Sequence, residues 1–309
     1  MNGDLKDQAP ENSGPQSNGG PADSDAQTFD ANAHRRDSLA GWEAAASGWT
    51  RRQETIRRFG APVSEWMLDA VALQPGERVL ELAAGLGETG MLAAQKVAPM
   101  GGVIVSDQAD AMLDGARARA AELGLSNVEF QVIGAEWIDL PLASVDVVLC
   151  RWGYMLLADP PAALRETRRV LRPGGRVALA VWDSVQHNPW ALLPAIELIE
   201  RGLSTPPAPG IPGPFALGDP ERVRKLLQQA GFAETDVQSL DVAQRHDSFD
   251  TFWEMTLDIS RAFHDAVLSR PEPEIAAIRQ GLAGRMEPFL KPDGSLEIPG
   301  RTLVASASA

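Results

Sequence analysis

The residues that most clearly indicate a chemical role form a glycine turn at the end of an apolar run. The run begins at Val79 and leads into Gly85-Leu86-Gly87, after which a helix is expected. Glycines let a backbone bend sharply and approach a ligand closely, and the start of a helix offers free N–H groups. This pattern predicts a cofactor-binding turn, which in an open parallel sheet lies beyond the carboxyl ends of the strands.

A carboxylate follows the next expected strand. Asp107 comes twenty-two positions after Gly85, where its two oxygens can accept hydrogen bonds from both hydroxyls of a ribose. Together with the spacing Gly85-x-Gly87-x-x-Gly90, it also satisfies the dinucleotide fingerprint and suits NAD equally well. The glycines therefore predict an adenosine cofactor without choosing which one.

Two further features distinguish the candidates. Glu81 lies inside the strand end, four positions before Gly85, where nicotinamide-binding turns normally have apolar residues and where an acid can meet a positively charged ligand group. The string Arg172-Pro173-Gly174-Gly175-Arg176 then leads into an apolar strand that ends at Trp182. With these features the chain resembles the class I S-adenosylmethionine-dependent methyltransferases, nearest to the ubiquinone and menaquinone biosynthesis C-methyltransferases. The resemblance spans about residues 42–232.

The resemblance implies a role for each matching position. The methionine portion of S-adenosylmethionine would be held by Glu81 and by the turn of Gly85, Leu86 and Gly87. Asp107 would hold the ribose.

Further matching positions lie at the two ends of this expected site. Gly134, Ala135 and Glu136 would flank the adenine, and Arg151, directly after the fourth strand, would lie near the cofactor and the substrate entrance.

Three departures from the family pattern narrow this interpretation. Family members commonly have glycine where Ala83 stands, and an acid or amide where Gly134 stands, so the usual side-chain hydrogen bond to adenine is absent. The fourth strand is followed by Arg151-Trp152-Gly153-Tyr154 and not by an Asp/Asn-Pro-Pro-aromatic motif, which argues against methylation of base amino groups.

Methyl transfer from a sulfonium is an in-line displacement in which positioning dominates the catalysis. A carbon or oxygen nucleophile also needs its proton removed, so a base is expected within reach. The candidates are His187, after the fifth strand, and Tyr154, the only tyrosine. For each, a surface or packing role is the alternative.

Apolar runs alternate with helical patterns along the chain, which predicts an α/β fold with a doubly wound, mostly parallel sheet. In the family that the chain resembles, this is a seven-stranded, Rossmann-like sheet. Residues 1–35 are polar and rich in glycine and proline, and we expect a disordered leader there. The methyltransferase domain would occupy residues 36–309, with helical cover insertions at about 184–218 and 249–298. The strands expected are 79–83, 103–106, 128–132, 145–150, 176–182 and 301–307.

The charge and residue composition of the chain argue against several classes of partner. A formal net charge of −14 repels nucleic acid and anionic lipid. The only cysteine, Cys150, cannot make an internal disulfide or a thiolate cluster, and no carboxylate pair for magnesium is evident, so we expect no metal. No apolar run approaches the roughly 20 residues that a membrane span needs, and we expect a cytoplasmic protein that does not insert into membranes.

These observations favour a methyltransferase that acts on carbon or oxygen of a small molecule. Trp42, Trp49 and Trp66 precede the expected domain core, where they either cover an apolar acceptor or pack helices onto the sheet. Two alternatives remain open: an NAD(P)-dependent oxidoreductase, and a non-catalytic regulatory protein that binds the cofactor. The sequence does not indicate the oligomeric state.

Overall fold

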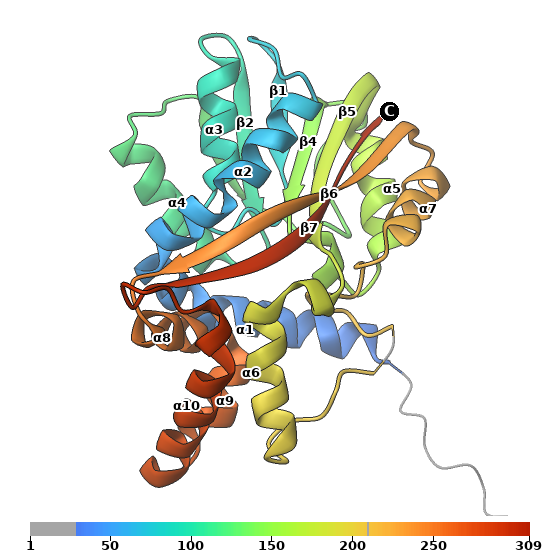
Figure 1. Ribbon diagram of the computed structural model, residues 1–309. Coiled ribbons are helices and arrows are strands. Elements are labelled where there is room, and N and C mark those ends of the chain that lie inside the picture. Colours follow the sequence, from blue (N-terminus) through green and yellow to red (C-terminus); the bar gives the residue numbers. More distant parts are fainter. Residues whose placement is uncertain (1–28, 209) are drawn as a thin grey trace, which may run out of the picture. The chain divides into compact units, whose positions relative to one another are not determined.

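The structure, a computed structural model, describes residues 29–208 and 210–309 and contains a seven-stranded mixed sheet (Figure 1). Its strand order is β3-β2-β1-β4-β5-β7-β6. The strands β1 to β5 run parallel, while β7 is antiparallel to both of its neighbours, β5 and β6. The expected mostly parallel seven-stranded sheet is thus confirmed. The strands are β1 Arg78–Glu81, β2 Gly102–Asp107, β3 Val128–Val132, β4 Val145–Arg151, β5 Leu171–Trp182, β6 Ala233–His246 and β7 Leu296–Ser308.

Helices connect the strands and cover both faces of the sheet. The connection from β1 to β2 and that from β4 to β5 lead in opposite directions along the sheet, so right-handed crossovers place their helices on opposite faces. On one face α3 packs beside α2, and on the other α5 packs beside α7. The helices concerned are α2 Gln53–Ala70, α3 Glu88–Val97, α4 Asp110–Glu122, α5 Pro160–Val170 and α7 Pro220–Gln229.

Two of these helices begin with a capping residue that the sequence makes recognisable. The side chain of Asp159 accepts a hydrogen bond from the backbone N–H of Ala162, and that of Asp219 accepts one from Glu221. Each cap is followed by a proline, whose fixed φ suits the first helical turn. An aspartate followed by a proline thus marks the start of both α5 and α7.

The interior divides into a sheet core and a smaller helical core. The sheet core is lined by valine, leucine and alanine from β1, β2, β4, β5 and β7. The helical core joins α6, α8, α9 and α10 to the start of β7, and these helices extend away from the sheet (Figure 1). They fall within the two segments expected as helical covers. Their bounds are α6 Pro189–Glu200, α8 Phe249–Ile259, α9 Arg261–Leu268 and α10 Glu272–Met286.

The region before the first strand differs from expectation. A helix, α1, spans Ala31–Arg51, so the expected leader boundary near residue 35 falls inside a helix, while residues 1–28 lie outside the described part. Pro62 lies inside α2, although proline favours the first turn of a helix. The helix continues around it because α2 packs along α3 and the sheet, and this packing offsets the missing hydrogen bond.

The later strands also differ from expectation. The Pro173-Gly174-Gly175 turn is an irregularity within β5, since Leu171 lies opposite Val145 whereas Arg176 lies opposite Val147. β6 is a long edge strand that was not predicted, and β7 begins at Leu296, five residues before the expected start. In the part of the chain that the structure describes, no helix is long and apolar enough to cross a membrane.

Candidate cofactor site

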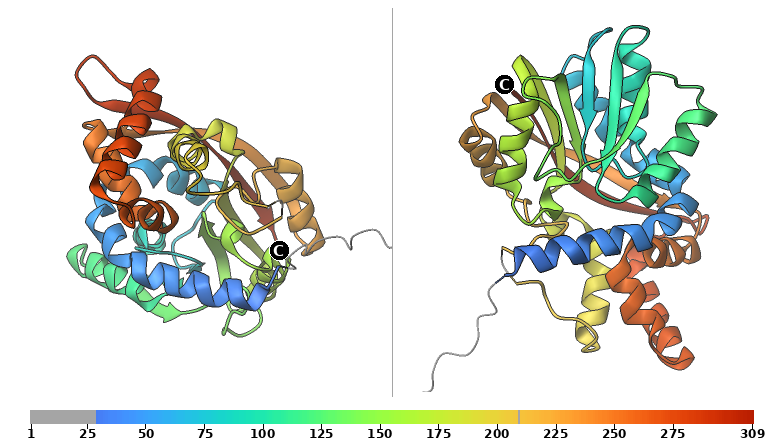
Figure 2. Two further views of the ribbon diagram at one scale, coloured as in Figure 1. Left: turned by 90° about the horizontal axis from the view of Figure 1, so that it is seen from below. Right: turned by 180° about the vertical axis from the view of Figure 1, so that it is seen from behind.

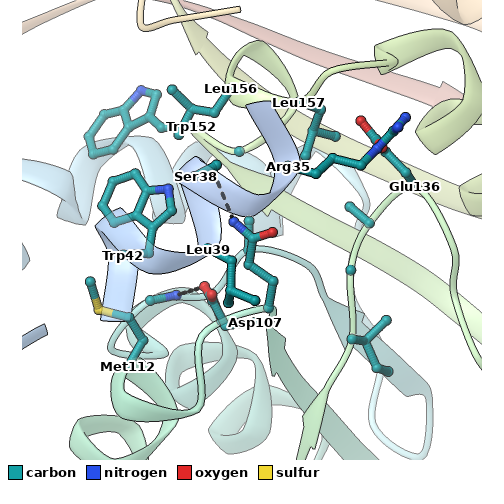
Figure 3. A pocket seen from close by; sticks show the side chains of 18 of the residues that line it. Arg35, Ser38, Leu39, Trp42, Asp107, Met112, Glu136, Trp152, Leu156 and Leu157 are labelled. Carbon is teal, nitrogen blue, oxygen red and sulfur yellow. Dashed lines mark hydrogen bonds and ion pairs between the residues drawn. The ribbon is translucent and has the colours of Figure 1, made fainter. Parts of the chain in front are cut away.

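A cavity of about 560 Å³ lies at the carboxyl ends of the strands. One wall consists of the loops that follow β1, β2, β3 and β4, and the other is α1, whose side chains line the cavity from His34 to Trp49 (Figure 3). Figure 2 shows α1 crossing this edge of the sheet. Ligand pockets commonly have volumes of roughly 300–1,000 Å³, so the cavity is large enough for a small cofactor.

The turn after β1 has the backbone that its glycines predicted. Gly85 has φ +54°, and Gly87 has φ +75° as the N-cap of α3. No atom lies within 4 Å of the place where a Cβ on Gly85 would stand, so a ligand can approach this backbone. Ala83, where the family commonly has glycine, also has a left-handed φ of +50°, which is unfavourable for a residue with a side chain.

Asp107, at the end of β2, is held in place by the backbone around it. One carboxylate oxygen accepts a hydrogen bond of 2.9 Å from Gly85 N–H, and the other accepts one of 2.9 Å from Ala109 N–H. Burial raises the pKa of this carboxyl, while these two N–H groups oppose the rise. Asp107 lines the cavity and thereby presents a fixed acceptor beside the glycine turn.

Glu81 and Arg151 lie at the other end of the strand-end wall, on the neighbouring strands β1 and β4. Glu81 accepts a hydrogen bond of 2.9 Å from Gly90 N–H, and burial raises its pKa to about 8 against the opposing charge of Arg151. Burial also lowers the pKa of Arg151. A carboxyl and a guanidinium, both shielded from water, thus share one end of the cavity.

The residues after β3 form the opposite end. Gly134 and Ala135 line the cavity, and no atom lies within 4 Å of a Cβ position on Gly134. The Glu136 carboxylate is already engaged, because it pairs with Arg35 and accepts a hydrogen bond from the backbone N–H of Asp159. Glu136 therefore lines the site while it ties α1 and the loop before α5 together.

Most of the side chains that α1 contributes to the cavity wall were not predicted from the sequence. Trp42 and Trp49 line the cavity and pack against Leu86 and Met112 under α1, with Trp42 facing Trp152 across the cavity (Figure 3). Trp66, in contrast, packs on the sheet core. Trp42 and Trp49 thus cover the cavity, whereas Trp66 packs a helix onto the sheet. A stripe at spacings of three and four, Leu39-Trp42-Ala46-Trp49, is the signal that could have identified this helix.

Three expected site residues lie outside the cavity lining. Leu86 is buried in the small cluster under α1, and a Cβ on Gly87 would meet Met91 and Val105, so both support the turn from behind. Tyr154 is buried in the sheet core, where its hydroxyl lies 2.6 Å from that of Thr167. Burial raises the pKa of this phenol well above its usual value.

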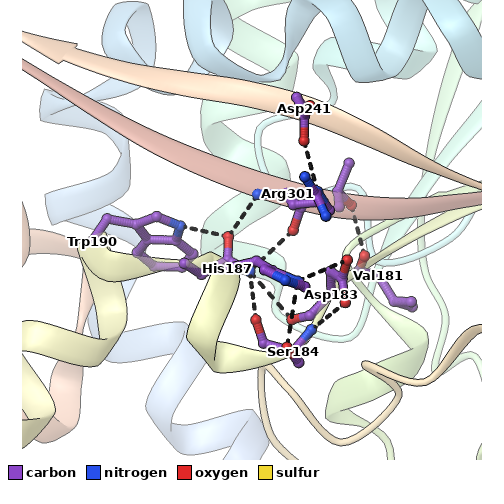
Figure 4. Close-up of polar contacts among 9 residues, drawn as sticks. Val181, Asp183, Ser184, His187, Trp190, Asp241 and Arg301 are labelled. Carbon is purple, nitrogen blue, oxygen red and sulfur yellow. Dashed lines mark hydrogen bonds and ion pairs between the residues drawn. The ribbon is translucent and has the colours of Figure 1, made fainter.

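His187 is also outside the cavity lining. Its ring is half exposed and its Nδ1 lies 3.2 Å from the Asp183 carboxylate (Figure 4). The loop around it is fixed by the buried Asn188 side chain, which donates to the carbonyls of Asp183, Ser184 and Arg301. This arrangement anchors α6 to β7. Within residues 29–208 and 210–309, no group of three or more His, Cys, Asp or Glu side chains is placed to hold a metal ion.

Comparison with known proteins shows which domains this chain is similar to. Residues 73–203 match a methyltransferase domain family. The arsenite methyltransferase of Halobacterium salinarum is 32% identical over 204 residues, which are 65% of this chain and 48% of that protein. The nocamycin O-methyltransferase of Saccharothrix syringae is 31% identical, over 57% of this chain and 66% of its own length.

The ubiquinone/menaquinone biosynthesis C-methyltransferase UbiE of Shewanella oneidensis is 31% identical, over 43% of this chain and 52% of its own length. The chain thus spans between about half and just under two thirds of these relatives.

Solved structures show the same fold. A Bacillus halodurans C-125 protein classed as a methyltransferase superposes with a TM-score of 0.53 at 19% identity, covering 79% of this chain and 97% of that one. YcgJ of Bacillus subtilis gives a TM-score of 0.52 at 20% identity, with the same coverage. Residues 73–203 are thus similar in sequence to methyltransferase domains, and the sheet is similar in fold to these two structures. Of the cofactors that the glycines left open, these matches support S-adenosylmethionine.

The residues of the cavity fit this cofactor. Its ribose needs an acceptor at a fixed place, where Asp107 lies, and its ammonium needs an acceptor, for which the Glu81 carboxyl is placed. Its adenine needs open space, which is present at Gly134. Seven of the nine residues expected to bind the cofactor line the one cavity: Glu81, Gly85, Asp107, Gly134, Ala135, Glu136 and Arg151.

Proposed function

We propose that the protein transfers the methyl group of S-adenosylmethionine to carbon or oxygen of a small, largely apolar molecule. The observation that carries this proposal is the composition of this cavity. Among its polar groups, Asp107 and Glu81 lie at the strand ends, while Trp49, Trp152 and Leu156 close much of the remainder. The polar part suits the cofactor, and the apolar part suits the acceptor.

When bound, S-adenosylmethionine supplies an electrophilic methyl group on a sulfonium that is an excellent leaving group. The task of this chain is to bind, orient and exclude water. Asp107 would fix the ribose, Glu81 the ammonium, and the open backbone at Gly85 would allow close approach. The α1 side chains Trp42 and Trp49 would keep water from the apolar end.

The acceptor class rests on both the cavity and the relatives. UbiE is a C-methyltransferase and the nocamycin enzyme an O-methyltransferase, which supports either atom. Neither His187 nor Tyr154 lines the cavity, so we favour an acceptor such as a phenol or enol that ionises readily. The arsenite methyltransferase makes arsenite a necessary member of any acceptor panel.

The first test is ligand binding. A ligand at about one hundred times its dissociation constant stabilises a fold by roughly 2.7 kcal/mol, so saturating S-adenosylhomocysteine should raise the melting temperature whereas NADH should not. A melting temperature that rises with NADH and not with S-adenosylhomocysteine would instead indicate a nicotinamide-dependent oxidoreductase.

The second test is turnover. Purified protein with S-adenosylmethionine should methylate at least one member of a panel of phenols, quinols, enols and arsenite, detected as S-adenosylhomocysteine release. Tight binding without transfer to any acceptor would instead indicate a regulatory protein that retains the cofactor site.

A further inference from the structure

A second cavity, of about 530 Å³, lies where α2, β6 and α8 meet. We call it the α2–β6 groove, and the two elements that form its sides can be followed in Figure 1. It shares no lining residue with the cofactor cavity. Its volume falls within the range of roughly 300–1,000 Å³ that is common for ligand pockets, so the groove is large enough for a ligand of its own.

The floor of the α2–β6 groove is apolar and is shielded from bulk water. Val242 of β6 is 8% exposed and Met255 of α8 is 4% exposed, yet both line the groove. Phe59 and Pro62 of α2, together with Ala243, complete the apolar lining. Apolar surface gains free energy when a ligand removes it from water. The floor therefore suits a hydrocarbon chain.

The rim of the groove carries two arginines, Arg58 on α2 and Arg245 on β6. Their side chains are 66% and 77% exposed. Arg58 lies 3.7 Å from Glu54, and Arg245 lies 3.8 Å from Glu297. Both of these carboxylates lie closer to another cation, at 2.6 Å and 3.5 Å respectively. The two guanidinium groups are therefore only loosely paired within the protein.

The carboxylate and the amide that also line the groove are engaged. Asp241 pairs with Arg301 at 2.7 Å, and the Gln244 side chain lies 3.3 Å from Nε2 of His246. The acid is thus neutralised while the two rim arginines are not, so the rim attracts anions in a chain whose formal net charge is −14.

We propose that the α2–β6 groove binds a single-chain amphiphile with an anionic head group, of the chemical class of the fatty acids. The hydrocarbon chain lies on the floor beside Val242 and Met255, and the carboxylate meets Arg58 and Arg245 at the rim. A guanidinium presents parallel N–H donors that match a carboxylate. This site is distinct from the cofactor cavity and goes beyond the proposed methyl transfer.

Phe59 gives the groove an optical signal. Its ring stacks on Trp152 with a centroid distance of 5.5 Å and on Trp182 at 5.6 Å. Because Phe59 also lines the groove, a ligand there touches a ring that contacts two tryptophans. Binding should therefore change the tryptophan fluorescence of the full-length protein.

The test compares three probes, decanoate, decanol and octanoate, by isothermal titration calorimetry and fluorescence. Decanol lacks the charge and should bind roughly 3- to 10-fold more weakly than decanoate, since exposed ion pairs contribute modestly. Octanoate lacks two methylenes and should bind roughly 10-fold more weakly. Saturating S-adenosylhomocysteine should leave the affinity for decanoate unchanged, because the two cavities are separate.

Two variants locate the head group and the chain. The double variant Arg58→Gln with Arg245→Gln should bind decanoate only as well as decanol. Its control is Arg261→Gln, since Arg261 is exposed and pairs with Asp265 on α9. Ala243→Phe places a ring in the groove and should weaken decanoate and decanol at least 10-fold.

Ser239→Phe is the control for Ala243→Phe. Ser239 is exposed on the same strand, four residues earlier and hence on the same face, and does not line the groove. It should leave both affinities unchanged. The surface variants of the two arginines keep the test informative if Ala243→Phe fails to fold.

Four results would overturn the proposal. Competition between decanoate and S-adenosylhomocysteine would place the chain in the cofactor cavity. Equal affinities for decanoate and decanol would remove the head-group contact, and an unchanged affinity in Ala243→Phe would remove the groove. The absence of binding by all three probes would reject the site as a whole. Because S-adenosylhomocysteine binding is measured separately, none of these results decides the proposed function.

Discussion

The two walls of the cavity are built in different ways. On the strand-end wall, Glu81 and Asp107 are buried and are held by backbone N–H groups of the turns that follow β1 and β2. On the α1 wall, the helix packs through Trp42 and Trp49, and its polar contacts to the opposite rim are partly exposed: Arg35 pairs with Glu136 with its side chain 43% exposed, and Ser38 meets Gln108 at 3.1 Å.

The difference indicates a division of labour. Groups fixed by buried backbone cannot relax when a ligand leaves, so the strand-end wall is suited to recognition. Exposed ion pairs contribute little free energy, so the Arg35–Glu136 pair adds little to the hold on α1, which is held mainly by the packing of Trp42 and Trp49 on Leu86 and Met112. Its other end is anchored more firmly, because Arg52 pairs with both Asp258 and Glu254 of α8.

The largest effect is expected at Asp107. Replacing Asp107 with Ala would remove the two charge-assisted hydrogen bonds that we propose to the ribose and should weaken S-adenosylhomocysteine binding about 100-fold or more, measured by calorimetry. Asp110→Ala is the control, since this nearby carboxylate is exposed and pairs with Arg117. A loss below about threefold in Asp107→Ala would mean that the ribose is held elsewhere and that the comparison of the walls is wrong.

The second prediction, of intermediate size, concerns the protonation of Glu81 on the strand-end wall. Because the folded-state pKa of Glu81 is raised from 4.5 to about 8, the folded protein holds a proton that the unfolded chain releases. Its contribution to the free energy of unfolding is complete below pH 4.5 and is lost as the pH rises through 8, at about 1.4 kcal/mol per pH unit between these values.

Glu81→Gln cannot lose this proton. Denaturant unfolding at pH 6, 7 and 8 should therefore show the wild type losing stability relative to the variant as the pH rises. Parallel curves for the two proteins would show that Glu81 is already ionised at pH 6.

The smallest equilibrium effect is expected on the α1 wall. Arg35→Ala removes an exposed pair worth at most about 1 kcal/mol, so the affinity for S-adenosylhomocysteine should fall less than about fivefold, chiefly through faster dissociation. Stopped-flow tryptophan fluorescence can follow this rate, since Trp42 and Trp152 line the cavity. Arg57→Ala, whose partner Glu54 lies on α2, is the control. A loss comparable to that of Asp107→Ala would give the two walls equal weight.

The parts of the site that the sequence predicted follow from topology. Apolar runs define β1, β2 and β4, and parallel strands place whatever follows them at one edge, so Glu81, Asp107 and Arg151 could be brought together without coordinates. The caps at Asp159 and Asp219 fixed two helix starts for a similarly local reason.

The features that could not be predicted from the sequence depend on the direction of the chain after a strand and on weak hydrophobic patterns. After β4 a short 3₁₀ turn, Tyr154–Leu156, carries Tyr154 into the core toward Thr167, and no spacing rule reveals such a rotation. The helix α1 was not predicted because its apolar stripe of Trp42, Ala46 and Trp49 is narrow and adjoins a polar segment. β6 is an edge strand whose first half is largely exposed on both faces, so it lacks the alternation that marks a half-buried strand.

The central place of β7 has a consequence for synthesis of the protein. β7 lies between β5 and β6 but follows both in the sequence. While the ribosome adds residues 183–295, at about 5–20 residues per second, the β5 edge of the nascent sheet has no strand beside it. An unpaired edge invites pairing with other chains, so the interval before residue 308 emerges is when this protein most needs a chaperone.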